Sequence, residues 1–228
     1  MEFYSWILQN RETIKIIYAL LIVLICAIIS LKSHKMFKLS DYQGIRYLRN
    51  AFFFYGIAFF IRYILGSNFY SFPENYINLI NGLFGFFFIM GGFFLLYSLL
   101  WKKIESIHNI SFSSIFNFRI FIFYLMAIIF VLLDYFWNSF HFLFYSQAII
   151  FLMAFAISFN NYYSNGRNRK FLKFYTFAML LAFIAWTLNA VIEKVFHWDP
   201  RVHILIYLLN IIVFLVFLFG IIKVTQRK

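Results

Sequence analysis

The sequence predicts an all-α protein, a polytopic membrane protein built as a bundle of seven transmembrane helices. Hydrophobic residues make up 64% of the 228-residue chain and charged residues only 12%, whereas about 25% charged is usual for soluble domains. Seven stretches reach the roughly 20 apolar residues that a helix needs to cross a bilayer. Runs such as 120–133 are apolar on every side. This excludes a transmembrane β-barrel, whose strands alternate apolar and polar residues.

The composition excludes three other classes of protein. A soluble domain of this size has too little interior to hide so much apolar surface, and the mean hydropathy of +0.83 is far above that of disordered chains. A disulfide scaffold needs paired cysteines, and the chain has only Cys26. The net charge of +12 does not predict nucleic-acid binding, because the basic residues fall in short loops, where membrane proteins concentrate them.

The first three spans are predicted over 13–31, 44–66 and 77–101. The first span is followed by Lys32. Because it has no basic segment before it and no small-residue cleavage site after it, it does not resemble a signal peptide and is expected to remain as a helix. The whole chain is predicted to form one domain over 1–228, with residues 1–12 as an interfacial segment. In the third span Gly82, Gly85 and Gly92 share one face, which predicts close packing against a neighbouring helix.

The last four spans are predicted over 118–136, 142–161, 171–196 and 202–224. Trp101, Trp137 and Trp198 fall at or next to predicted helix ends, as tryptophans at membrane–water interfaces do. Both prolines lie in predicted loops, so no span is expected to be broken by proline. The sequence between 203 and 222 holds no lysine, so a retinal Schiff base is not expected, and no other cofactor is predicted.

The distribution of basic residues predicts the orientation. Of the 20 lysines and arginines, 15 lie on the side of the loops that follow the first, third and fifth spans, and 5 on the other. Cytoplasmic loops carry the excess of basic residues. The sequence therefore predicts a multi-pass protein of the plasma membrane, with its N-terminus outside and its C-terminus in the cytoplasm.

Polar side chains at membrane depth gather in the predicted outer half. On the sixth span Trp186, Asn189, Glu193 and His197 follow at steps of 3, 4 and 4 residues, a spacing that places them on one helix face. Polar groups at such depth are costly and usually face the interior of a bundle. The ligand-binding residues predicted here are Arg62, Asp134, Asn189, Glu193 and His197.

Three interpretations of these residues remain open. Arg62 can form an ion pair with Asp134 or Glu193 that locks helices together. The residues can instead line a vestibule in which Arg62 holds an anionic ligand or histidines respond to pH. Glu193 and His197, four residues apart, can also hold a metal ion with His203. Separately, Asn189 and Asn210 lie at similar depth on successive spans, which predicts a hydrogen bond between them.

Basic residues on the predicted cytoplasmic side mark a second surface. Contact with lipid headgroups accounts for such residues, and docking of a cytoplasmic signalling partner is the functional alternative. The residues that we expect to face such a partner are Arg46, Arg49, Lys102, Lys103, Arg167, Arg169 and Lys170.

Three segments carry a resemblance in layout: 44–65 (GIRYLRNAFFFYGIAFFIRYIL), 93–105 (FFLLYSLLWKKIE) and 171–196 (FLKFYTFAMLLAFIAWTLNAVIEKVF). They resemble small uncharacterised seven-helix membrane proteins of archaea, and are similar to the seven-helix sensor regions of some membrane histidine kinases. The resemblance implies a sensor fold, but it brings no functional residues with it. Since no kinase domain follows the spans, a sensor of this kind is expected to signal through a partner.

These observations predict a sensor- or receptor-like membrane protein with a ligand- or pH-sensing cluster in its outer half. No catalytic motif is found, so an enzyme is not expected. A small transporter or channel component is the first alternative, and a metal-dependent membrane enzyme the second.

Overall fold

The structure is a computed structural model that describes residues 9–40, 42–66, 73–105, 118–137, 139–164, 170–196 and 200–225. Within these ranges only the backbone is described at 74–75, 102–105, 118–119, 170–171, 193–196, 200–203 and 224–225.

The described chain is helical nearly throughout. Its elements are α2 (Arg11–Ser40), α3 (Gln43–Phe59), the π-helical turn η1 (Phe60–Leu65), α4 (Glu74–Glu105), α5 (Phe118–Trp137), α6 (His141–Ser164), α7 (Lys170–Phe196) and α8 (Pro200–Thr225). With η1 continuing α3, these ranges contain 7 helices that are long and apolar enough to cross a membrane. The prediction of an all-α protein with seven helices able to cross a membrane is confirmed.

Two boundaries differ from the prediction in an informative way. Arg11 and Glu12 belong to α2, not to the predicted interfacial segment 1–12, of which residues 1–8 lie outside the described chain. The second span ends in the π-helical turn η1, which an apolar pattern does not distinguish from an α-helix. Both differences fall at the end of the bundle where α2, α4, α6 and α8 begin, hereafter the pocket end. The opposite end is called the far end.

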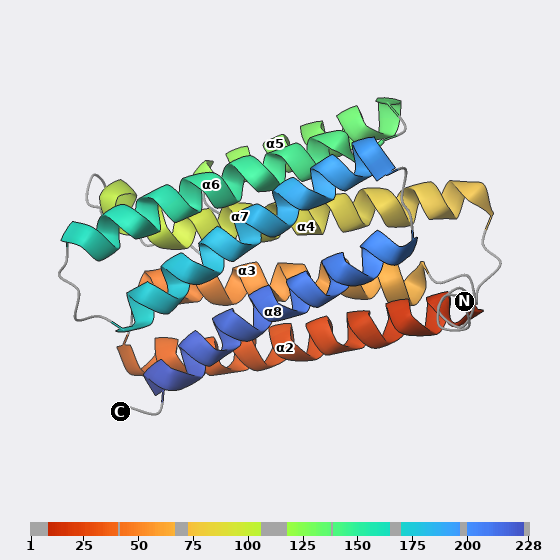
Figure 1. The fold of residues 1–228 in the computed structure, drawn as a ribbon. Coiled ribbons are helices and arrows are strands. Elements are labelled where there is room, and N and C mark those ends of the chain that lie inside the picture. The colour runs from red at the N-terminus through yellow and green to blue at the C-terminus, as the bar shows by residue number, and fades with distance from the viewer. Residues whose placement is uncertain are drawn as a thin grey trace.

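Six helices form a closed ring, and the seventh lies outside it. α2 packs against α3, α3 against α4, α4 against α6, α6 against α7, α7 against α8, and α8 returns to α2. α5 packs against α4 and α6, and Figure 1 shows it running beside α6 at one edge of the molecule, with α2 at the opposite edge. In the most apolar 18-residue stretch of α5, 17% is buried inside the bundle, whereas in that of α4 the buried share is 67%. α5 is therefore the peripheral helix and α4 the central one.

Aromatic rings fill the middle of the bundle. Phe52 and Tyr55 of α3 meet Phe214 of α8 edge to face, and Phe88 of α4 packs on Trp186 of α7 with 4.6 Å between the ring centroids. Aromatic pairs in such arrangements add stability beyond that of buried area. Eleven of the described phenylalanines are buried in this core.

Glycines on α4 let its neighbours approach closely. A Cβ at Gly91 would lie 2.9 Å from the ring of Tyr55, and a Cβ at Gly92 would lie 2.9 Å from Oε1 of Gln147. Gly85 faces Val131 of α5 and Leu143 of α6. These contacts bring α4 against three neighbours, as small residues do in membrane bundles.

Candidate functional site

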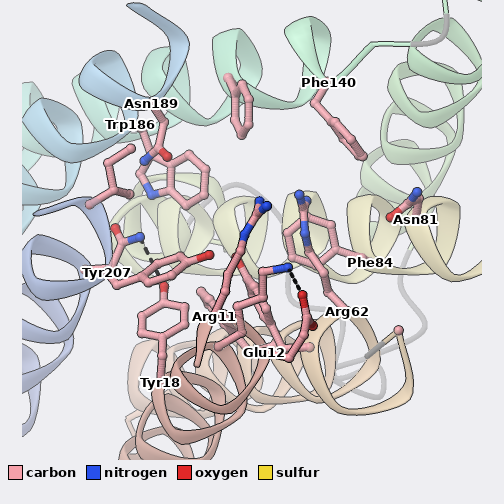
Figure 2. Close-up of a pocket in the computed structure, with 17 residues that line it drawn as sticks. Arg11, Glu12, Tyr18, Arg62, Asn81, Phe84, Phe140, Trp186, Asn189 and Tyr207 are labelled. Carbon is pink, nitrogen blue, oxygen red and sulfur yellow. Dashed lines mark hydrogen bonds and ion pairs between the residues drawn. The ribbon is translucent and has the colours of Figure 1, made fainter. Parts of the chain in front are cut away.

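A cavity of about 270 Å³ lies at the pocket end of the bundle. Every helix of the ring contributes to it, while α5 contributes none of the lining residues among the described part of the chain. Figure 2 shows charged side chains from α2 and η1 on one wall and Trp186 and Asn189 of α7 on the other. The cavity is lined by Arg11, Glu12, Lys15, Tyr18, Phe59, Arg62, Tyr63, Gly66, Asn81, Phe84, Phe140, Phe144, Trp186, Asn189, Ile206, Tyr207 and Asn210.

The first wall is cationic and comes from the first turns of α2 and from η1. Lys15 Nζ donates to Oε1 of Glu12 at 2.7 Å, three residues earlier on the same helix. Lys15 and Glu12 therefore neutralise one another, while Arg11 and Arg62 add two further positive charges to the lining. Figure 2 shows the guanidinium ends of Arg11 and Arg62 pointing into the same space. Because three cations face one carboxylate, the lining carries a formal charge of +2.

Arg62 is held between aromatic rings. Its guanidinium carbon lies 4.4 Å from the ring centroid of Phe84 on α4 and 4.7 Å from that of Phe140, just before α6. Such cation–π contacts stabilise a guanidinium without neutralising its charge. Of the two ion pairs considered for Arg62, the one with Asp134 is not formed among the described side chains, and the guanidinium is flanked by aromatic rings. The side chain of Glu193 is not described.

The π-helical turn positions this arginine. The backbone N–H of Gly66 donates to the carbonyl oxygen of Ile61 at 3.1 Å, a step of five residues that is typical of π geometry. One wider turn changes the direction in which the following side chains leave the helix axis. Single π-helical turns are frequent at functional sites, and this turn contains Arg62 and Tyr63, both of which line the cavity.

Tyrosines form another part of the lining. Tyr18 of α2 stacks on Tyr207 of α8 at 4.3 Å between ring centroids and meets Tyr63 edge to face at 5.4 Å. Asn210 Nδ2 donates to the Tyr18 hydroxyl at 3.1 Å. This hydrogen bond joins α8 to α2 and closes the ring of helices beside the cavity.

The predicted hydrogen bond between Asn189 and Asn210 is not formed. Asn189 Nδ2 donates to the carbonyl oxygen of Ala185 in its own helix at 2.9 Å, and Asn210 turns to Tyr18. In this bond the side-chain amide of Asn189 uses its Nδ2 as the donor, and its Oδ1 is the acceptor of the same side chain. Asn189 lines the cavity, although its hydrogen-bond partner differs from the expected one.

Asp134 is placed away from the cavity lining, where it caps a helix. Its Oδ1 accepts the backbone N–H of Phe142 at 2.9 Å and its Oδ2 accepts that of Leu143 at 2.8 Å. These donors lie in the first turn of α6, where backbone N–H groups have no partner within the helix. The carboxylate therefore connects the end of α5 to the start of α6, which is a structural role.

The rest of the predicted cluster lies largely outside the described side chains. Glu193 and His203 are described in backbone only, and His197 lies outside the described chain. Among the described residues no group of three His, Cys, Asp or Glu side chains could hold a metal ion. The metal ligands proposed from sequence, Glu193, His197 and His203, remain a prediction.

Sequence reasoning missed the contribution of α2. Arg11 and Glu12 fall in the predicted interfacial segment, and Lys15 and Tyr18 in a predicted span, so none of the four is predicted as a site residue. The available signal was the spacing of Arg11, Lys15 and Tyr18 at steps of 4 and 3 residues. That spacing places polar side chains on one helix face ahead of an apolar run.

At the far end, the structure describes two of the predicted partner-facing residues. Nη1 of Arg49 lies 2.9 Å from Nδ1 of His34 on α2, and its Nε and Nη2 donate to Oδ1 of Asn50. Arg46 lies over the ring of Phe37 at 5.8 Å. The backbone places Lys102 and Lys103 near the end of α4 and Lys170 at the start of α7, while Arg167 and Arg169 lie outside the described chain.

Comparison with known proteins gives one partial relative. No family model matches the chain. An uncharacterised protein of Archaeoglobus fulgidus is 32% identical over 99 residues, which are 39% of this chain and 44% of that protein. The match therefore covers less than half of the relative's length. It agrees with the predicted resemblance to uncharacterised archaeal proteins, whereas the resemblance to histidine kinases stays a prediction.

Proposed function

We propose that the chain is a sensor- or receptor-like protein of the plasma membrane whose cavity binds a small ligand from outside. The cavity lies at the end of the bundle that the distribution of lysine and arginine assigns to the outside. In this orientation the N-terminus is outside, the C-terminus is cytoplasmic, and the far end faces a cytoplasmic partner.

The observation that carries this proposal is that one cavity is lined by all six helices of the ring. A ligand bound there contacts every element whose relative position defines the bundle. It therefore favours whichever arrangement of those helices binds it better, which is the thermodynamic basis of a conformational signal.

The middle of the bundle favours binding over conduction. Phe88 lies one turn beyond the cavity-lining Phe84 on α4, and Phe88, Tyr55 and Phe52 are almost completely buried. These rings occupy the space between the cavity and the far end. Buried polar groups in this region bond to one another, as the Tyr55 hydroxyl donates to Oε1 of Gln147, and they do not line the cavity. This packing supports binding over conduction.

The partner is proposed to bind at the far end. The basic residues predicted for this contact include Arg46 and Arg49 on α3, the helix that continues through η1 to the cavity. A change in the packing of η1 can thus reach this end along one continuous helix. The resemblance to the sensor regions of membrane histidine kinases supports such signalling by analogy of fold.

Cysteine labelling tests the orientation. Asn78 at the pocket end and Lys35 at the far end are exposed, and the native Cys26 is buried. We expect a membrane-impermeant maleimide to label Asn78→Cys in intact cells and Lys35→Cys only after permeabilisation, with the wild type as the unlabelled control. The reverse pattern would overturn the proposed orientation.

A distance measurement tests the signalling function. Spin labels at Lys35→Cys on α2 and Lys173→Cys on α7, in a Cys26→Ala background, report the spacing of two ring helices at the far end. We expect sulfate, phosphate, acetate or benzoate to shift the distance distribution, and Arg62→Gln to abolish that shift. Lys32→Gln, which alters an exposed cation at the far end outside the proposed partner contact, is the control. An unchanged distribution with an anion shown to be bound would refute the sensor function.

A further inference from the structure

The cavity combines paired guanidinium groups with aromatic walls, and this combination selects a class of ligand. We propose that its ligand is a small aromatic carboxylate, with the carboxylate between Arg11 and Arg62 and the ring against α7 and α6. The inference rests on the proposed function, because it takes the cavity to be the ligand site.

The charge of the lining selects an anion. Lys15 is neutralised by Glu12 at 2.7 Å, so Arg11 and Arg62 are the cations left to meet a ligand among the described residues. Their guanidinium ends point into the same space (Figure 2). Two like charges that face each other repel, and an anion between them removes this repulsion. Guanidinium groups match the two oxygens of a carboxylate in planar, bidentate geometry.

The rest of the lining selects a carboxylate over a phosphate. A phosphate presents oxygens in several directions, and each oxygen needs a donor once it is removed from water. Beyond the cationic wall the lining includes the apolar or aromatic side chains Phe59, Phe84, Phe140, Phe144, Trp186 and Ile206. Two of its asparagine amides already donate within the bundle, Asn189 to Ala185 and Asn210 to Tyr18. A carboxylate turns both oxygens to one wall and leaves an apolar body for the other.

The size of the cavity sets the size of that body. A cavity of about 150 Å³ holds one benzene molecule. By this scale the 270 Å³ here has room for about eleven non-hydrogen atoms, which is one ring with a short carboxylate arm. The amphipathic shape of such a molecule corresponds to the two walls.

Rings on the second wall favour an aromatic body over an aliphatic chain. Trp186 already packs on Phe144 at 5.9 Å and on Phe88 at 4.6 Å, so its orientation is fixed before a ligand arrives. A flat ring gains stacking or edge-to-face contact with such a surface. A flexible chain of equal volume loses more conformational freedom on binding.

The test uses the purified full chain in detergent and four probes: phenylacetate, octanoate, 2-phenylethanol and inorganic phosphate. Binding to the folded state raises the unfolding temperature with ligand concentration, which yields a Kd for each probe. We expect phenylacetate to bind at least about tenfold more tightly than the other three, since each lacks the ring, the charge or the apolar body.

Variants locate the two halves of the ligand. We expect Arg11→Gln and Arg62→Gln to raise the Kd of phenylacetate by about ten- to a hundredfold, the effect of losing a charge-assisted hydrogen bond. Lys32→Gln, which alters an exposed cation at the far end that belongs to no proposed site, is expected to leave it unchanged. Phenylacetate should also quench the fluorescence of Trp186, so Trp186→Phe should lose the quenching while retaining a thermal shift.

The outcomes separate this inference from the proposed function. The ligand class would be overturned if octanoate, phosphate or 2-phenylethanol bound as tightly as phenylacetate. If that binding were lost in Arg62→Gln or Trp186→Phe, the cavity would still be the ligand site. Quenching that persists in Trp186→Phe would overturn the placement of the ring. If no probe binds, and Arg11→Gln and Arg62→Gln merely lower the unfolding temperature equally in every buffer, both proposals fail.

Discussion

Replacing Asp134 tests whether this carboxylate caps a helix or binds a ligand. Asp134→Ala removes the acceptor of two backbone N–H groups, those of Phe142 at 2.9 Å and Leu143 at 2.8 Å. Loss of a helix cap costs about 1 kcal/mol, and a hydrogen bond to a charged group contributes about 1.5–3 kcal/mol. With two such bonds at a partly buried helix start, we expect the free energy of unfolding to fall by about 2–3 kcal/mol. Asp134→Asn keeps one carbonyl oxygen as acceptor and should lose about 1 kcal/mol.

The assay is equilibrium unfolding in mixed micelles, followed by far-ultraviolet circular dichroism, together with the Kd of phenylacetate for each variant. Glu12→Gln is the matched control for the unfolding measurement alone, because it alters a carboxylate at the same end whose ion pair is partly exposed. Such pairs contribute at most about 1 kcal/mol. An Asp134→Ala variant as stable as the wild type but tenfold weaker in ligand binding would refute the capping role. The ligand-binding role predicted from sequence would then be correct.

Two further predictions concern packing. Asn210→Leu should lower the free energy of unfolding by about 0.6 kcal/mol, the average for a hydrogen bond between membrane helices, because it removes the bond to Tyr18; no loss in the micelle assay would contradict a contribution from this bond. Gly91→Ala should destabilise by about 1–3 kcal/mol, since its Cβ would lie 2.9 Å from the Tyr55 ring. In the same assay Gly82→Ala, with 3.6 Å to its nearest neighbour, should be neutral or stabilising by up to about 1 kcal/mol. Equal effects of the two glycine substitutions would show that helix propensity, rather than close contact, determines the change in stability.

The number and approximate positions of the spans could be predicted from sequence because one strong force sets them. The helix ends could not, since α2 continues past the predicted residue 31 to Ser40. A bilayer core requires about 20 apolar residues per helix, and each predicted range lies within, or within one residue of, the helix found there. The range 118–136, for example, became α5, Phe118–Trp137. Close packing at the glycines of α4 could likewise be predicted from sequence, because close approach of membrane helices needs small side chains.

The partners of the polar residues could not be predicted in the same way. Charge complementarity favours an acidic partner for Arg62, but the fold places Phe84 and Phe140 around it. The direction of the arginine depends on the π-helical turn Phe60–Leu65, and apolar periodicity carries no mark of such a turn. Asp134 was assigned to a ligand-binding cluster, with an ion pair to Arg62 as one alternative, whereas the start of α6 supplies it with backbone donors. These outcomes depend on which helices become neighbours.

The arrangement of the ring also predicts where a ligand signal should be weakest. α5 lines no part of the cavity within the described chain and packs against α4 and α6, so a ligand reaches it only through those two helices. A spin-label pair at Lys35→Cys and Phe121→Cys joins α2 to α5, and both native side chains are exposed. With α2 as the common reference, we expect the spacing of α2 and α7 to respond to an aromatic carboxylate more than that of α2 and α5. A larger response of the α5 pair would mean that the signal bypasses the ring, and the proposed route from the cavity through η1 and α3 would then be wrong.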